Sequence, residues 1–390
     1  MLDFSFISPT QFAFGKETQH KAGAFCRRYG TKALLHYGGG SVVKSGLLDQ
    51  IRQSLEQAGV ACVELGGVQP NPRDTLVYEG IALCRRENVD VVLAVGGGSV
   101  IDSAKAIALG VPYAGDFWDF YTGGKTVTQV LPLGVVLTLP AAGSEGSNST
   151  VITKEESALK RFCDSDLLRP KFSILNPELT YTLPPFQTAC GAVDMMAHVM
   201  ERYFTNTTGV GLTDHMCEAV LLSVMKYARI ALHNPRDYDA RANLMWAGVV
   251  AHNDVLGVGR QQDWATHMIE HELSGLYDVA HGAGLAVIFP AYLRYQYPYN
   301  VMRVAQFAQR VFGVEMDFEQ PERTASEGID RLEAFYREIG MPTSFAELGA
   351  KEEDIEKLAA KVLLNNGDRL GSFHPLTRAD IAEVYRYACK

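Results

Sequence analysis

The chain has 390 residues, of which 47% are hydrophobic and 21% charged, a composition typical of a globular protein long enough for two hydrophobic cores. Its net charge of −9, without a basic stripe, argues against nucleic acid as a partner. Seven cysteines without paired spacing indicate thiols rather than disulfides, and the absence of a signal segment or a long apolar run favours a cytoplasmic protein that does not enter membranes.

The first half of the chain alternates between strand-like and helical patterns. Short β-branched runs predict strands at residues 32–37, 61–65, 89–95, 134–138 and 172–175. Helical patterns lie between them, which predicts a mostly parallel sheet covered on both faces. Beyond residue 183, apolar spacing predicts helices at 184–204, 211–233, 236–257, 262–276, 300–313, 323–340, 351–366 and 378–389. The last of these helices begins with Thr377 and Asp380 at capping-box spacing.

Two glycine-serine turns follow predicted strands. Gly96-Gly97-Gly98-Ser99 lies between a buried apolar run and a helix that carries Asp102, and Gly38-Gly39-Gly40-Ser41 repeats the arrangement upstream. Free backbone N–H groups at such a helix start can bind a pyrophosphate, and the small loop at 141–150 can line the same crevice. Ile101 stands where the dinucleotide fingerprint has its third glycine, so a tight turn without a ligand remains the alternative.

One carboxylate and three histidines form a candidate metal site. Asp194 and His198 are four residues apart on one predicted helix, whereas His267 lies on another and His281 just beyond its end. Such a donor set suits Fe(II) or Zn(II). Each histidine alone is more often a core or surface residue, and the spacing from His267 to His271 is not the zinc-protease pattern.

These patterns predict an α/β fold followed by an all-α fold. We expect a dinucleotide-binding domain at residues 1–180 with a mostly parallel sheet, and an all-helical metal-binding catalytic domain at residues 181–390. The active site is expected in the cleft between the two domains.

The chain resembles the iron-containing (group III) alcohol dehydrogenases and is most similar to their butanol dehydrogenase and NADPH-dependent aldehyde reductase branch. The resemblance implies a dehydroquinate synthase-like fold. The matching motifs run along nearly the whole chain and include YGGGSVVKSG (37–46), PNP (70–72), VGGGSVIDSAKAIA (95–108), TLPAAGSE (138–145), PPFQTACGAVDMMAHVME (184–201), QDWATHMIEHELS (262–274) and VAHGAGLAVIFPA (279–291).

The resemblance implies roles for particular residues. The metal ligands fall on Asp194, His198, His267 and His281, and the dinucleotide contacts fall on Gly39, Ser41, Asn71, Gly97, Gly98, Ser99, Asp102, Thr138, Ser144 and Lys160. His271, one helical turn after His267, is a candidate proton relay, with a packing role as the alternative. Relatives that prefer NAD often carry Asp at the position of Gly39, so NADP(H) is favoured over NAD(H), with Lys44 or another cation to assist.

Three positions depart from the family pattern. Asn176 replaces an acid in a predicted turn, and Ala142 replaces a threonine hydroxyl. An asparagine that relatives present to the cofactor does not align cleanly, so Ser147 or Asn148 is expected to substitute for it. None of these departures touches the metal ligands.

The resemblance implies NAD(P)-dependent conversion between primary alcohols and aldehydes such as butanol and butyraldehyde. Phe162, Trp264, Met268 and Val151 are candidates for an apolar substrate pocket, although each is more often a plain core residue. A glycerol or polyol dehydrogenase and a dehydroquinate synthase-like lyase are alternatives on the same fold; a metal-free binding protein and a zinc hydrolase are more distant ones. A homodimer is expected because symmetric assemblies are the default.

Overall fold

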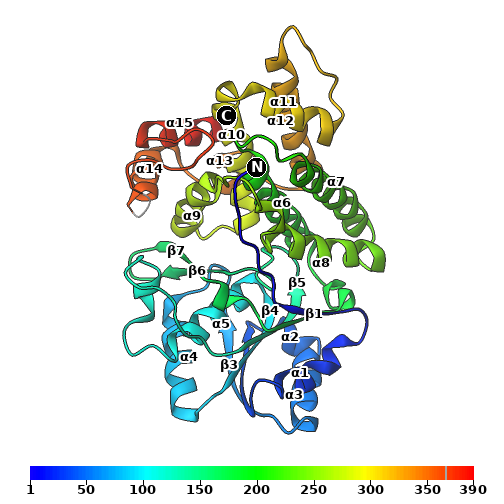
Figure 1. The fold of residues 1–390 in the computed structure, drawn as a ribbon, viewed down its shortest axis with the longest axis vertical. Helices are drawn as coiled ribbons and strands as arrows, with labels where there is room; N and C mark the ends of the chain where they lie inside the picture. The colour runs from blue at the N-terminus through cyan, green and yellow to red at the C-terminus, as the bar shows by residue number, and fades with distance from the viewer. Residues whose placement is uncertain (365–366) are drawn as a thin grey trace. The chain divides into compact units, whose positions relative to one another are not determined.

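The computed structural model describes residues 1–364 and 367–390, which form two compact units (Figure 1). The unit that we call the N-terminal unit contains Ile7–Leu183 and Pro235–Val249. The C-terminal unit contains Met1–Phe6, Pro184–Asn234 and Val250–Lys390. Within the described ranges, no helix combines the length and the hydropathy that crossing a membrane requires.

The N-terminal unit is built on a six-stranded, all-parallel sheet with the order β1-β8-β5-β4-β2-β3. Its strands are β1 (Gln11–Phe14), β2 (Lys32–Gly38), β3 (Ala61–Val68), β4 (Val91–Gly97), β5 (Leu133–Leu139) and β8 (Phe172–Leu175). The five predicted strands are confirmed. The sequence analysis missed the short edge strand β1 and a separate antiparallel hairpin, β6 (Ser149–Lys154) with β7 (Leu159–Asp164).

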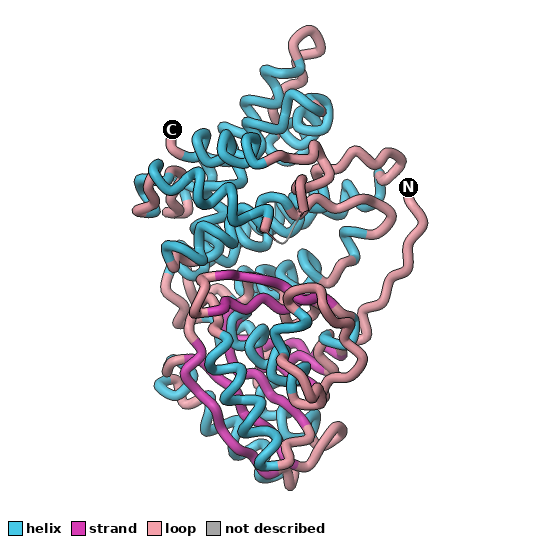
Figure 2. Tube along the Cα trace, turned by 90° about the vertical axis from the view of Figure 1, so that its left-hand side faces the viewer, coloured by secondary structure: helices cyan, strands magenta, loops and turns pink. Residues whose placement is uncertain are grey.

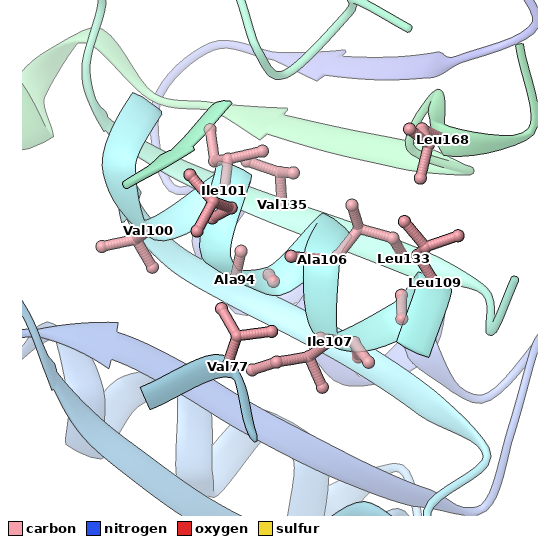
Figure 3. Close-up of a cluster of buried hydrophobic side chains, with 14 of the residues drawn as sticks. Val77, Ala94, Val100, Ile101, Ala106, Ile107, Leu109, Leu133, Val135 and Leu168 are labelled. Atoms are coloured by element: carbon pink, nitrogen blue, oxygen red, sulfur yellow. The ribbon is translucent and has the colours of Figure 1, made fainter. Parts of the chain in front are cut away.

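Helices cover both faces of this sheet. Alternate residues of a strand point to opposite sides, and here the residues on both sides are apolar. Ala94 and Val135 pack on one side against Ile101 and Ile107 (Figure 3). Leu93 and its alternate neighbours pack on the other side. The helices of this part of the chain are α1 (Ala22–Cys26), α2 (Ser41–Lys44), α3 (Leu47–Gln57), α4 (Asp74–Glu87) and α5 (Gly98–Gly110). Apolar residues thus pack on both faces of the sheet, which agrees with the predicted parallel sheet covered by helices on both sides.

The C-terminal unit is helical (Figure 2). Its helices are α6 (Pro185–Tyr203), α7 (Gly211–His233), α9 (Ala265–Tyr277), α10 (His281–Gln296), α11 (Val301–Phe312), α12 (Pro321–Glu338), α13 (Phe345–Leu348), α14 (Ile355–Leu363) and α15 (Arg378–Ala388). The predicted capping box is confirmed: the Asp380 N–H donates to Thr377 Oγ1, and the Thr377 N–H donates to the Asp380 carboxylate. Residues 365–366 of the predicted helix 351–366 lie outside the described residues.

Helix α8 (Tyr238–His252) begins in the N-terminal unit, although the sequence analysis placed this segment in the second domain. Packing explains the difference. Met245 and Val249 are completely buried in the core of the N-terminal unit, and Trp246 meets Phe12 edge to face at 5.5 Å between ring centroids. Periodicity predicts the helix correctly but carries no information about which core receives its apolar face.

A buried histidine makes the stability of the N-terminal unit sensitive to acid. His36 Nδ1 donates to the Leu65 carbonyl (2.8 Å) and Nε2 accepts from Ser103 Oγ (2.9 Å), while burial lowers the His36 pKa from 6.5 to about 4. The unfolded chain takes up this proton first, so stability is expected to fall as the pH drops from 6.5 towards 4, by roughly 3 kcal/mol at most. Denaturant unfolding across this pH range checks the expectation, since His36→Asn should have a shallower pH dependence. Parallel curves for both proteins would contradict it.

Candidate active site

Three helices supply the predicted metal ligands. Asp194 and His198 lie one turn apart on α6, His267 lies in the first turn of α9, and His281 is the first residue of α10. One ligand atom each from Asp194, His267 and His281 lies within 4.8 Å of the others. His198 lies beside this group, with Nδ1 at 3.4 Å from Asp194 Oδ1 and its ring at 4.6 Å from that of His267.

Two glycines let the first turn of α10 approach the other two helices. A Cβ on Gly282 would lie 2.2 Å from the backbone oxygen of Cys190, one turn before Asp194 on α6. A Cβ on Gly284 would lie 2.4 Å from Glu270 Oε1 on α9. Any side chain at Gly282 would push against backbone, so this glycine is what allows His281 to lie near Asp194.

Carboxylates orient two of the imidazoles. Glu201 Oε1 accepts from the backbone N–H of His267 (3.0 Å) and from its Nδ1 (2.8 Å). Glu270 contacts His281 Nδ1 in the same way. Because an ionised carboxylate only accepts hydrogen bonds, both Nδ1 atoms carry the proton and both Nε2 atoms keep a lone pair. Those Nε2 atoms lie 4.0 Å (His267) and 3.8 Å (His281) from Asp194 Oδ1.

The donor set fits a divalent cation. His267 Nε2 and His198 Nδ1 are buried and have no hydrogen-bond partner among the described residues. A buried polar atom without a partner is costly, and a metal would satisfy both nitrogens. Burial, with added contributions from His252, His267 and Arg202, lowers the His198 pKa well below its ordinary value. The imidazole of His198 is therefore neutral near pH 7, the form that binds metals.

His271 lies one turn after His267 on α9 and is buried. Its ring centroid is 5.6 Å from that of His281. His271, Glu270 and His281 form a second group whose ligand atoms lie within 4.8 Å of one another. The proposed relay therefore lies next to the candidate ligands, beside His281 and the Glu270 carboxylate that contacts it.

The predicted dinucleotide contacts gather at the carboxyl edge of the parallel sheet. Strand β4 lies between β2 and β5, so the turn after Gly38, the turn at Gly97–Gly98 and the end of β5 near Thr138 are neighbours. Gly98 starts α5, and Ser99 lies in its first turn. This juxtaposition gives a helix N-terminus at the crevice where parallel sheets bind nucleotides.

Asp102 and Lys105 fasten the loop after β5 onto α5. Asp102 Oδ1 accepts from Ser144 Oγ (2.6 Å) and Oδ2 from the Val151 N–H (3.1 Å). Lys105 Nζ donates to the Ser147 carbonyl (2.9 Å) and hydroxyl (3.1 Å) and to the Ser149 carbonyl (2.8 Å). Burial raises the Asp102 pKa and lowers that of Lys105 to about 8, against the effect of each group's charge on the other. The Ser147 side chain, a predicted substitute for asparagine, is thus engaged within the protein.

The remaining predicted contacts lie around this loop. Lys160 Nζ on β7 donates to Asn71 Oδ1 (3.0 Å), and the Thr153 N–H on β6 donates to the Pro72 carbonyl (2.8 Å). The hairpin is thereby joined to the segment before α4. Gly39 is exposed, and a Cβ placed on it would meet no atom within 4 Å. Ser41 starts α2 directly after this turn.

Two family models match the chain in succession. The model described as iron-containing alcohol dehydrogenase matches residues 9–177, and the C-terminal model of the Fe-containing alcohol dehydrogenase family matches residues 188–389. The chain belongs to the iron-containing alcohol dehydrogenase family. The family resemblance in the motifs, the predicted fold class and the predicted enzyme class, an NAD(P)-dependent alcohol dehydrogenase, are confirmed.

Relatives in this family match along the full chain. A probable NADH-dependent butanol dehydrogenase of Bacillus subtilis is 41% identical over 386 residues, covering 99% of both chains. The NADPH-dependent aldehyde reductase YqhD of Escherichia coli is 36% identical over 398 residues, covering 100% of both. The crystal structure of NADH-dependent butanol dehydrogenase A from Thermotoga maritima has a TM-score of 0.96 and 40% identity, covering 100% of this chain and 99% of that one. Among these relatives, the butanol dehydrogenases are named as NADH-dependent and the aldehyde reductase as NADPH-dependent.

Two residues beside the candidate metal ligands and one beside the loop after β5 were not assigned roles by the sequence analysis. Glu201 and Glu270, which orient His267 and His281, are separated from them by 66 and 11 residues. Lys105, which holds the loop after β5, lies inside a quoted motif but received no role. One signal could have found the two glutamates: each is an acid about one helical turn after a candidate ligand, Glu201 after His198 and Glu270 after His267.

Proposed function

We propose that the protein reduces medium-chain aldehydes such as butyraldehyde to primary alcohols, with NADPH as the favoured hydride donor and one Fe(II) or Zn(II) ion. The observation that carries this proposal is the buried group of Asp194, His267 and His281, with both imidazoles oriented by carboxylates. Bound there, the metal would polarise the aldehyde carbonyl as a Lewis acid, while the nicotinamide would supply the hydride. The names of the butanol dehydrogenase and aldehyde reductase relatives support this substrate class.

The chain's own residues have distinct tasks in this proposal. Asp194, His198, His267 and His281 bind the ion, and Glu201 and Glu270 keep two imidazoles in the ligating tautomer. The turns at Gly39–Ser41 and Gly97–Ser99, with Asn71, Thr138, Ser144 and Lys160, bind the dinucleotide, and Asp102 holds the loop that carries Ser144. His271 passes a proton to the alcohol oxygen.

The decisive experiment follows nicotinamide absorbance with butyraldehyde, with NADPH and NADH at equal concentration, before and after chelation and repletion with Fe(II) or Zn(II). Metal-dependent oxidation of NADPH is expected, and His271→Gln should lower kcat with less effect on KM. Oxidation only with glycerol or another polyol would favour the polyol dehydrogenase alternative. No net oxidation with restored metal would favour the lyase alternative.

The cofactor preference is tested at Gly39. Because a Cβ there meets no atom within 4 Å, an aspartate fits without displacing the fold. Its carboxylate would repel the 2′-phosphate of NADPH, so Gly39→Asp is expected to shift the ratio of kcat/KM for NADPH over NADH roughly 10- to 100-fold towards NADH. Gly39→Asn, of the same shape without charge, is the matched control and should shift the ratio far less. A wild-type protein that already prefers NADH would overturn the proposed preference.

We also propose that the protein is a cytoplasmic homodimer. Strand β1 pairs with β8 on one side only, at the edge of the sheet, and exposes the Phe14 side chain. An exposed edge strand with an apolar side chain is a common contact between copies. Light scattering behind a sizing column measures the mass directly, and a monomer at micromolar concentration would refute the dimer.

A further inference from the structure

Trp264 has an unusual backbone conformation at the start of the helix that carries His267. Its φ of 66° lies in the left-handed region, and it caps α9 without a side-chain hydrogen bond to the helix. A bulky residue rarely adopts this conformation, which costs roughly 1–3 kcal/mol and persists only where its surroundings hold it. The contacts of the indole therefore hold this conformation in place.

The indole lies among three imidazoles. Its ring meets that of His267 at 5.2 Å and 65°, that of His198 at 5.8 Å and 61°, and that of His252 at 5.5 Å and 71°. These are edge-to-face arrangements, which favour one orientation of each ring over others. His252 in turn packs against His198 with 4.0 Å between centroids.

Arg202 and Gln262 also contact the indole. Its guanidinium carbon lies 4.7 Å from the centre of the Trp264 ring, within the range of a cation–π contact. Arg202 is itself completely enclosed, and Nη1 donates to the carbonyls of His198 (2.9 Å) and Ala251 (3.2 Å). The indole Nε1–H donates to Gln262 Oε1 (3.0 Å). The ring is therefore held in position and in rotation by groups other than the imidazoles that it contacts.

We infer that Trp264 is a positioning residue of the metal centre, which holds the imidazoles of His198 and His267 in their ligating orientation before the metal binds. The inference rests on the metal site of the proposed function and adds a residue that acts on the candidate ligands through ring packing. Its physical basis is preorganisation: an imidazole whose rotation is already restricted loses less freedom on binding. The strained backbone of Trp264 is the cost of placing a large aromatic ring at this point.

Zinc affinity tests the inference without reference to catalysis. The dissociation constant for Zn(II) alone is measured on the metal-free enzyme by competition with a chromophoric chelator. Trp264→Leu removes the aromatic ring and is expected to weaken Zn(II) binding about 10- to 100-fold, with Trp264→Phe falling between this variant and the wild type. Trp246→Leu, the same substitution at an exposed tryptophan of the N-terminal unit, is the control and should leave the affinity unchanged.

Two further readouts separate positioning from simple packing. Thermal unfolding of the metal-free variants measures packing, and a loss of stability with unchanged Zn(II) affinity would overturn the inference. The chain has three tryptophans, so Co(II) is expected to quench the fluorescence of a Trp118→Phe, Trp246→Phe protein in which Trp264 alone remains. Absence of quenching at saturating Co(II) would place the metal away from Trp264. Wild-type protein that binds Zn(II) tightly but oxidises no NAD(P)H would refute the proposed reaction and leave this inference standing.

Discussion

Asp194→Asn is expected to lose the bound metal and nearly all reductase activity. Asp194 is the only carboxylate in the group with His267 and His281, and its Oδ1 lies within 4.0 Å of a nitrogen of each of three histidines. Asparagine keeps the shape but removes the charge that attracts the cation. Metal catalysis of this kind supplies several kcal/mol of transition-state stabilisation, so kcat should fall about 10³-fold or more.

Metal content per chain and steady-state rates measure this result in parallel. Asp330→Asn is the matched control, since Asp330 is an exposed aspartate on α12 that pairs with Arg294. The control should retain both metal and activity. A variant at Asp194 that binds one metal per chain with wild-type kcat would show that the ion is held elsewhere.

Gly282→Ala is expected to destabilise the C-terminal unit and to weaken metal binding together. The added methyl carbon would lie 2.2 Å from the Cys190 carbonyl oxygen, and a backbone atom cannot move aside as a side chain can. Overpacking of this kind costs typically about 1–3 kcal/mol. Relief of the clash would move α10 away from α6, and with it His281 from Asp194.

Denaturant unfolding and Zn(II) titration of the same preparations check both effects. Gly211→Ala serves as the control, because Gly211 starts α7 and a Cβ there would meet no atom within 4 Å. That substitution is expected to be neutral or slightly stabilising. Equal stability and equal affinity for the Gly282 variant and the control would mean that α6 and α10 can separate without affecting the site.

The fold was largely predictable because its elements are long or strongly patterned. Continuous β-branched runs predicted β2, β4, β5 and β8, and three-to-four spacing predicted most helices of the C-terminal unit but missed α10 and α13. The hairpin of β6 and β7 was missed because its two segments, STVITK and LKRFCD, contain neither a continuous apolar run nor a strict polar–apolar alternation. The placement of α8 was wrong because the core that receives Met245 is chosen by tertiary packing.

The candidate site was predictable for ligand types but not for the residues behind them. The four predicted ligands can each donate an electron pair to a metal ion, and they lie in recognisable motifs: Asp194, His198, His267 and His281. The acids that orient two of them, Glu201 and Glu270, act through a spatial relation that spacing does not encode. Trp264 was considered only for the substrate pocket, because its backbone angle and its ring contacts with the histidines are properties of the folded chain.

The route of the chain has a consequence for how the protein can be divided. The polypeptide passes from one unit to the other after residues 6, 183, 234 and 249, so neither unit is a continuous segment. A gene truncated after residue 183 would encode a sheet without Met245 and Val249 in its core. The remaining piece would carry α8 without the sheet that buries its apolar side chains. The two halves are therefore not interchangeable modules, and recombination between family members should succeed only when the exchanged block includes residues 235–249 with the sheet.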